Sequence, residues 1–166
     1  MAKKVRQYAC LIMAVVVYFL IHEGAHALVA LYYGVFESIR FLGVGIQVVV
    51  DHEAMTETQI VMVCLVGAVS TVIAGWAFLL MSRTICSFKS AYVRTFGWYV
   101  TMVLLILDPL YLSVLYRYVG GGDMNGIQLL VPERAAQITF GALLVINAIA
   151  MVVLAYKPYK ESFQTA

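Results

Sequence analysis

The chain has 166 residues, of which 63% are hydrophobic and 12% are charged, and its formal net charge is +2. A soluble domain of this size cannot bury so much apolar surface, so the composition excludes that class and indicates an integral membrane protein. The small net charge, without a basic stripe interleaved with aromatic residues, argues against a nucleic-acid partner.

Four stretches are long and apolar enough to form membrane-spanning helices, which need about 20 such residues. They cover residues 8–33, 60–81, 96–116 and 135–156. The first follows a basic N-terminus, but it is too long for a signal-peptide core and no small-residue cleavage site ends it, so we expect it to be retained. No linker divides the chain. We therefore predict an all-α membrane protein, with one domain over residues 1–166.

Basic residues predict the orientation of these helices. Arg40, Arg117 and Arg134 lie in the loops on one side, together with most of the acidic residues. The other side holds the remaining eight cations: Lys3, Lys4, Arg6, Arg83, Lys89, Arg94, Lys157 and Lys160. The positive-inside rule then places both termini in the cytosol. The small size fits a prokaryotic plasma membrane.

The segment between the first two spans contains "SIRFLGVGIQVVVD", residues 38–51. It is rich in β-branched residues, alternates imperfectly, and has glycines at positions 43 and 45. A short β-hairpin fits this pattern, and an irregular loop in the membrane interface is the alternative.

Small residues at helical spacing in the second span predict close helix contacts. They are Gly67, Ser70 or Thr71, and Gly75, and the first span has its own set from Gly24 to Ala30. We expect these two spans to pack tightly. Asn147 is an amide within the fourth span, and we expect it to hydrogen-bond another helix, with a role in orienting substrate as the alternative.

The first span carries the sequence His22-Glu23-Gly24-Ala25-His26, an HExxH motif. Residues four apart share a helix face, so both imidazoles can reach one metal ion. Zinc favours such ligands, and a neighbouring carboxylate such as Glu23 can take a proton from water. Ionisable groups inside a span usually mark function. The alternative is a purely structural set of hydrogen bonds. The third histidine, His52, is expected to be a solvated loop residue.

A zinc site of this kind needs a third protein ligand, and two acids compete for that role. Asp108 lies in the third span at the same predicted depth as His22, about 21 Å from the cytosolic helix ends, and Pro109 is expected to break or kink the helix there. Asp123 lies in "GGGDMNGI", where glycines permit a tight turn that folds back into the bilayer. Depth alone favours Asp108.

The motifs "HEGAH" and "GGDMNGI" resemble those of the site-2 protease family of intramembrane zinc metalloproteases, in a small and divergent form. That resemblance implies an HExxH helix, often a β-hairpin after it, and an aspartate motif before the last helix. It favours His22, His26 and Asp123 as ligands of one Zn²⁺ per chain, with Glu23 as general base. Met124 stands where the family commonly has glycine, and the family's Asn-Pro context is absent or reduced to Asp108-Pro109, so the sequence does not identify the oxyanion partner.

The resemblance implies an endopeptidase that hydrolyses a peptide bond within or near a transmembrane segment of a protein substrate. An opened substrate helix would regain backbone hydrogen bonds by pairing with the edge of the 39–50 hairpin, which proline at Gln47 and Val49 would test. The alternative is a non-catalytic membrane protein of the same fold that binds a client helix. An ion carrier is disfavoured because no inverted repeat is visible.

Overall fold

The computed structural model describes residues 2–42, 45–120 and 122–164. Within these ranges four helical segments are long and apolar enough to cross a membrane, and a two-stranded hairpin follows the first, which confirms the predicted fold class. The elements are α1 (Ala2–Tyr33), β1 (Phe36–Leu42), β2 (Gly45–Val50), α2 (Glu57–Leu80), α3 (Ser82–Ser87), α4 (Ala91–Leu110), the π-helical turn η1 (Tyr111–Leu115), α5 (Tyr116–Val119), α6 (Gly122–Ile127), α7 (Glu133–Ala150), the π-helical turn η2 (Met151–Tyr156) and α8 (Lys157–Gln164).

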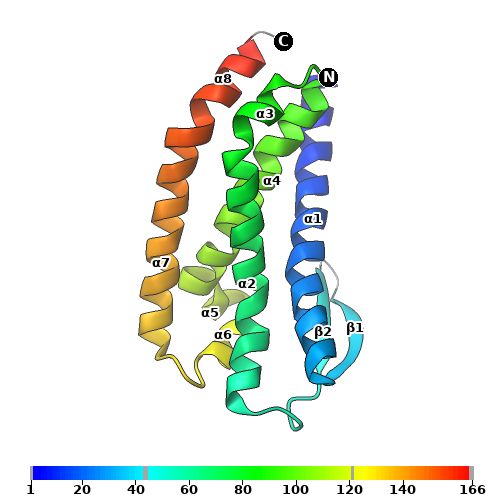
Figure 1. Ribbon diagram of the computed structural model, residues 1–166, viewed down its shortest axis with the longest axis vertical. Helices are drawn as coiled ribbons and strands as arrows, with labels where there is room; N and C mark the ends of the chain where they lie inside the picture. Colours follow the sequence, from blue (N-terminus) through cyan, green and yellow to red (C-terminus); the bar gives the residue numbers. More distant parts are fainter. Residues whose placement is uncertain (1, 43–44, 121, 165–166) are drawn as a thin grey trace.

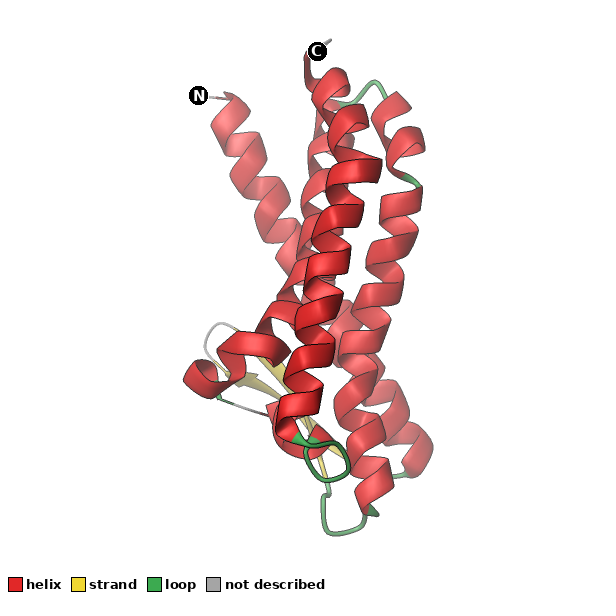
Figure 2. Cartoon of the chain, turned by 90° about the vertical axis from the view of Figure 1, so that its left-hand side faces the viewer, coloured by secondary structure: helices red, strands yellow, loops and turns green. Residues whose placement is uncertain are grey.

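The bundle is elongated, and both termini lie at one end of it (Figure 1). The hairpin and the short helix α6 lie at the opposite end, and Figure 2 shows the two strands beside the bundle there. The chain therefore has two distinct ends, one formed by the termini and one by the hairpin.

The hairpin lies beside the C-terminal half of α1 because the chain reverses at Gly34. This glycine has a φ of +72°, a left-handed conformation that favours glycine directly after a helix. The Val35 N–H then donates to the Ala30 carbonyl at 2.9 Å. The strands pair antiparallel, with Arg40 opposite Gln47. The predicted hairpin glycine at position 43 lies outside the described residues.

The third span continues through Pro109 instead of breaking there. Helix α4 extends to Leu110 and then widens into the π-helical turn η1. Proline cannot donate a hydrogen bond to the carbonyl four residues earlier, which belongs to Leu105. Asn147 of α7 supplies the missing donor, because its Nδ2 lies 2.8 Å from the Leu105 oxygen. Its Oδ1 accepts from Trp76 Nε1 at 3.0 Å. Asn147 thus joins three spans, as expected for an interhelical hydrogen bond.

Candidate metal centre

A cavity of about 750 Å³ lies at the hairpin end of the bundle. Residues from α1, strand β2, α2, α4 and α6 line it. All of the acidic and histidine residues singled out in the sequence lie along its wall: His22, Glu23, His26, His52, Asp108 and Asp123. The fold therefore brings the candidate residues into one space.

The two histidines of the motif face each other on α1. Their Nε2 atoms are 3.0 Å apart, and both side chains are buried. The His26 Nδ1–H donates to the Val63 carbonyl at 2.6 Å, and the His22 Nδ1–H donates to Asp108 Oδ2 at 3.2 Å. Because both Nδ1 atoms face acceptors, the neutral rings carry their lone pairs on Nε2. Two lone pairs at this distance repel each other unless a cation lies beside both.

Asp123 approaches the same two nitrogen atoms from α6. Its Oδ2 lies 3.2 Å from His22 Nε2, and its Oδ1 lies 3.6 Å from His26 Nε2. In a tetrahedral zinc site with bonds of about 2.0–2.1 Å, neighbouring ligand atoms are about 3.3 Å apart. The three observed separations bracket that value. The side chains of His22, His26 and Asp123 therefore fit one zinc ion with a fourth position left for water.

The aspartate segment has a different local structure from the expected turn. Residues 122–127 form the short helix α6, with Asp123 in its first turn, while Gly121 lies outside the described residues. Gly126 lets this helix pack on α2, since a Cβ there would collide with Cys64 Sγ and lie 3.0 Å from Cys64 Cβ. The approach of Asp123 to the histidines thus depends on a glycine one turn away.

Asp108 contacts the Nδ1 edge of the His22 ring, whereas Asp123 lies at the Nε2 edge. Besides the His22 Nδ1–H, it accepts from the Tyr18 hydroxyl at 2.5 Å and from the Thr71 hydroxyl. Its side chain is 1% exposed. A carboxylate on the distal nitrogen of a ligand histidine fixes the ring orientation and raises the basicity of the nitrogen that binds metal. Asp108 therefore lies where such a supporting carboxylate belongs.

Sequence reasoning did not include Tyr18 or the contact made by Thr71. Tyr18 lies four residues before His22 on α1, so helical spacing places it on the face that carries both histidines. Thr71 lies four residues after Gly67 on the facing side of α2. These two hydroxyls satisfy the buried carboxylate of Asp108, which would otherwise be costly in hydrocarbon.

Glu23 lies beside the two histidines and contacts the hairpin. Ligand atoms of His22, Glu23 and His26 all lie within 4.8 Å of one another. The Val48 backbone N–H donates to Glu23 Oε2 at 2.9 Å. This N–H points away from β1, so the free edge of strand β2 faces the carboxylate. The Glu23 carboxylate, next to the two imidazoles, is thereby held by the wall of the cavity.

Gly67 provides the space for both imidazole rings. A Cβ at this position would lie 2.5 Å from His26 Nε2 and 2.8 Å from His22 Cε1. The predicted close contact of the first two spans is therefore present at this point, where it surrounds the two imidazole rings. A glycine on α2 lets the helix backbone approach the ring faces.

His52 lies in the segment after β2 and lines the cavity, although it is exposed to solvent. No ligand contact to His22, His26 or Asp123 is found for it among the described residues. It borders the site without sharing the ligand position.

No family model, curated protein or solved structure matches the chain.

Proposed function

We propose that the chain is an intramembrane zinc endopeptidase of the site-2 protease type. It would hydrolyse a peptide bond within or near a transmembrane segment of another protein. The observation that carries this proposal is the set of three ligand atoms, spaced for tetrahedral zinc, with the carboxylate of Glu23 beside them. Four apolar spans around this set favour a substrate that lies in the bilayer.

Each residue has a defined task in this proposal. When bound, zinc supplies a Lewis acid that lowers the pKa of water and polarises a carbonyl group. Glu23 accepts the proton of the attacking water, whose oxygen forms the new bond to the peptide carbon. Glu23 then gives that proton to the nitrogen of the leaving amine as the C–N bond breaks. Asp108 keeps the His22 ring in the tautomer that presents Nε2 to the metal.

The substrate must be extended at the cleaved bond, because a helical peptide bond is shielded by its own turn. A strand added to β2 would place a carbonyl at the Val48 N–H, where the Glu23 carboxylate is bound in this structure. Pairing would then release Glu23 for proton transfer. In an antiparallel ladder the outward N–H groups alternate, so Gln47 and Val49 point to β1. Val48→Pro is therefore the direct test, and Gln47→Pro reports on the hairpin itself.

The decisive experiment measures bound zinc and cleavage together. The full-length protein and Glu23→Gln are purified in detergent without chelator, their metal content is determined by mass spectrometry, and both are incubated with a reporter transmembrane helix. We expect about one zinc per chain in both proteins and cleavage only by the unsubstituted one.

Three results would count against the proposal. Equal cleavage by both proteins would remove Glu23 from the reaction. An active preparation without stoichiometric transition metal would rule out a zinc hydrolase. Zinc in both proteins with no turnover of any reporter helix would favour a protein that only binds its client.

A further inference from the structure

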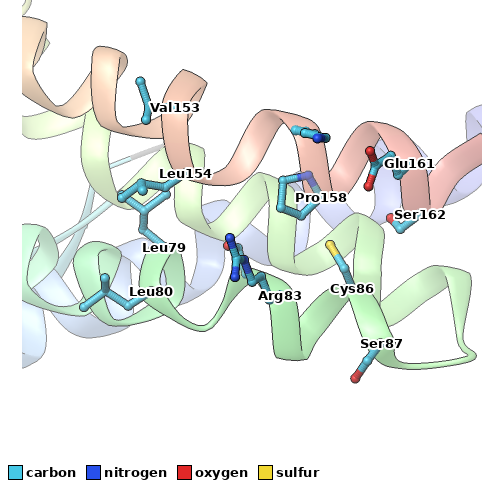
Figure 3. A pocket seen from close by; sticks show the side chains of 12 residues that line it. Leu79, Leu80, Arg83, Cys86, Ser87, Val153, Leu154, Pro158, Glu161 and Ser162 are labelled. Atoms are coloured by element: carbon cyan, nitrogen blue, oxygen red, sulfur yellow. The ribbon is translucent and has the colours of Figure 1, made fainter.

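A second cavity, of about 690 Å³, lies at the opposite end of the bundle from the metal centre. It opens between α2 and α3 on one side and η2 and α8 on the other (Figure 3). The two cavities share no lining residue. Whatever this second space holds, it is separate from the proposed hydrolytic chemistry.

The walls of the second cavity are divided into an apolar and a polar part. Leu79, Leu80, Val153 and Leu154 gather at one end of it (Figure 3). Cys86 and Ser162 lie towards the other end, and the guanidinium of Arg83 lies between the two groups. An occupant must therefore present hydrocarbon at one end and polar groups at the other.

The polar part carries an excess of positive charge. Arg83 and Lys157 line it, with Glu161 as the acid, and neither cation forms an ion pair with another residue in the described ranges. A third cation, Arg94, does not line the cavity, but its charge acts on Cys86 in the cavity wall. Its Nε is buried and has no hydrogen-bond partner among the residues described. Burial raises the pKa of the Cys86 thiol, while the Ser162 hydrogen bond and the charge of Arg94 oppose that rise.

The position of the cations along their helices matches the level of lipid headgroups. At 1.5 Å per residue, Lys157 lies about 36 Å along the helical segment from Glu133. Helix α2 ends at Leu80, about 35 Å from Glu57, and Arg83 follows directly in the separate helix α3. The hydrocarbon core of a bilayer is about 30 Å thick. With the acidic helix starts at one interface, both cations reach the headgroup layer of the other leaflet. The apolar part of the cavity then lies at the level of the acyl chains, where Leu80, Val153 and Leu154 are exposed.

We propose that this cavity binds one anionic phospholipid, with its phosphate between Arg83 and Lys157 and its acyl chains against the leucine and valine side chains. Basic pockets between membrane helices recognise such headgroups, and each nearby cation contributes about 1 kcal/mol. A soluble acidic peptide would satisfy the cations but would leave the apolar wall without a partner. The lipid satisfies both parts.

The test uses the full-length protein in neutral detergent with phosphatidylglycerol or phosphatidylcholine added, and native mass spectrometry to count bound lipid. We expect one phosphatidylglycerol to be retained in preference to phosphatidylcholine. The double variant Arg83→Gln/Lys157→Gln should bind phosphatidylglycerol roughly 25-fold more weakly, about fivefold for each charge. The matched control, Lys89→Gln/Lys160→Gln, removes two charges outside the cavity and should bind like the unsubstituted protein.

A further variant keeps the charges and fills the apolar part. Leu154→Trp should lower lipid retention although Arg83 and Lys157 remain. This variant tests the proposal even if the double variant does not fold. Equal loss in the double variant and its control would show general attraction to a basic surface and overturn the proposal. Displacement of the lipid by inorganic phosphate at millimolar concentration would also overturn the proposal, because it would indicate a site for free anions. Equal retention of phosphatidylglycerol and phosphatidylcholine would overturn it as well.

Discussion

The two ends of the bundle treat buried polar groups in opposite ways. At the hairpin end, the carboxylate of Asp108 is paired with three side chains from two other spans. At the end of the termini, the Nε atoms of Arg6 and Arg94 are buried without a hydrogen-bond partner among the described residues. Unpaired polar groups are costly in a bilayer. The hairpin end therefore satisfies its buried carboxylate with its own side chains, whereas the end of the termini leaves two buried guanidinium nitrogens unpaired within the described residues.

Removing a ligand histidine should have the largest effect on the hairpin end. His22→Ala deletes one of the three proposed ligands, so we expect zinc content to fall to background and cleavage to be lost. The loss should exceed the 10–100-fold cost of removing a supporting partner. His52→Ala is the control, because His52 lines the same cavity without sharing the ligand position. Zinc retained in His22→Ala would contradict the assignment.

Substituting the two aspartates one at a time distinguishes the proposed ligand, Asp123, from the proposed supporting carboxylate, Asp108. Asp108→Asn keeps an acceptor for the His22 Nδ1–H but removes the charge, so we expect zinc affinity to fall about 10–100-fold and to be restored by excess zinc. Asp123→Asn should lose zinc at all practical concentrations. Competition titrations with a coloured zinc chelator measure both affinities. The reverse order would make Asp108 the third ligand.

A methyl group at Gly67 should disturb the centre without removing any ligand. Its Cβ would press on the rings of both His22 and His26, and overpacking of this kind costs about 1–3 kcal/mol. We expect Gly67→Ala to bind zinc more weakly and to unfold at lower temperature. Gly24→Ala is the matched control, since a Cβ there meets nothing within 4 Å although it lies inside the motif. Equal behaviour of the two variants would refute the packing role.

The smallest expected effect concerns Asn147, which lies away from both ends. Asn147→Leu leaves the Leu105 carbonyl without its donor and should lower the free energy of unfolding by about 1 kcal/mol. Pro109→Ala restores a backbone N–H to that carbonyl, so the same substitution should cost less in the Pro109→Ala background. Unfolding by steric trapping in bicelles gives the four values of this cycle. A cost that is independent of residue 109 would disprove the compensation.

Local periodicity was sufficient to predict much of the site. The spacing of His22 and His26 places both rings on one face of α1, and the depth count places Asp108 beside His22. β-branched residues correctly indicated the hairpin. The helices extend further than predicted, α1 from Ala2 instead of residue 8, because hydropathy marks the bilayer and not the ends of helical hydrogen bonding. The sidedness of the termini and the kind of membrane stay predictions.

What periodicity could not predict depends on contacts between distant elements. Asp123 was one of two candidates and only the family resemblance favoured it over Asp108, because its approach requires Gly126 to pack against Cys64 of α2. Whether Asp108 faces Nδ1 or Nε2 of His22 depends on the rotation of α4 relative to α1. Neither the position of Asp123 nor the orientation of Asp108 can be predicted from the residue spacing within a single helix. The bond from Asn147 to Leu105 likewise joins residues from different spans, although Pro109 signals a carbonyl in need of a donor.

The bridge made by Asn147 also has a consequence for the proposed function, because it holds the fourth span in place. It ties α7 to α2 and α4, and among the described residues none from α7 borders the metal centre. Parting α7 from its neighbours would break these bonds without exposing the ligands. A client of the proposed protease would therefore meet strand β2 and helix α6, which border the cavity, and not the fourth span.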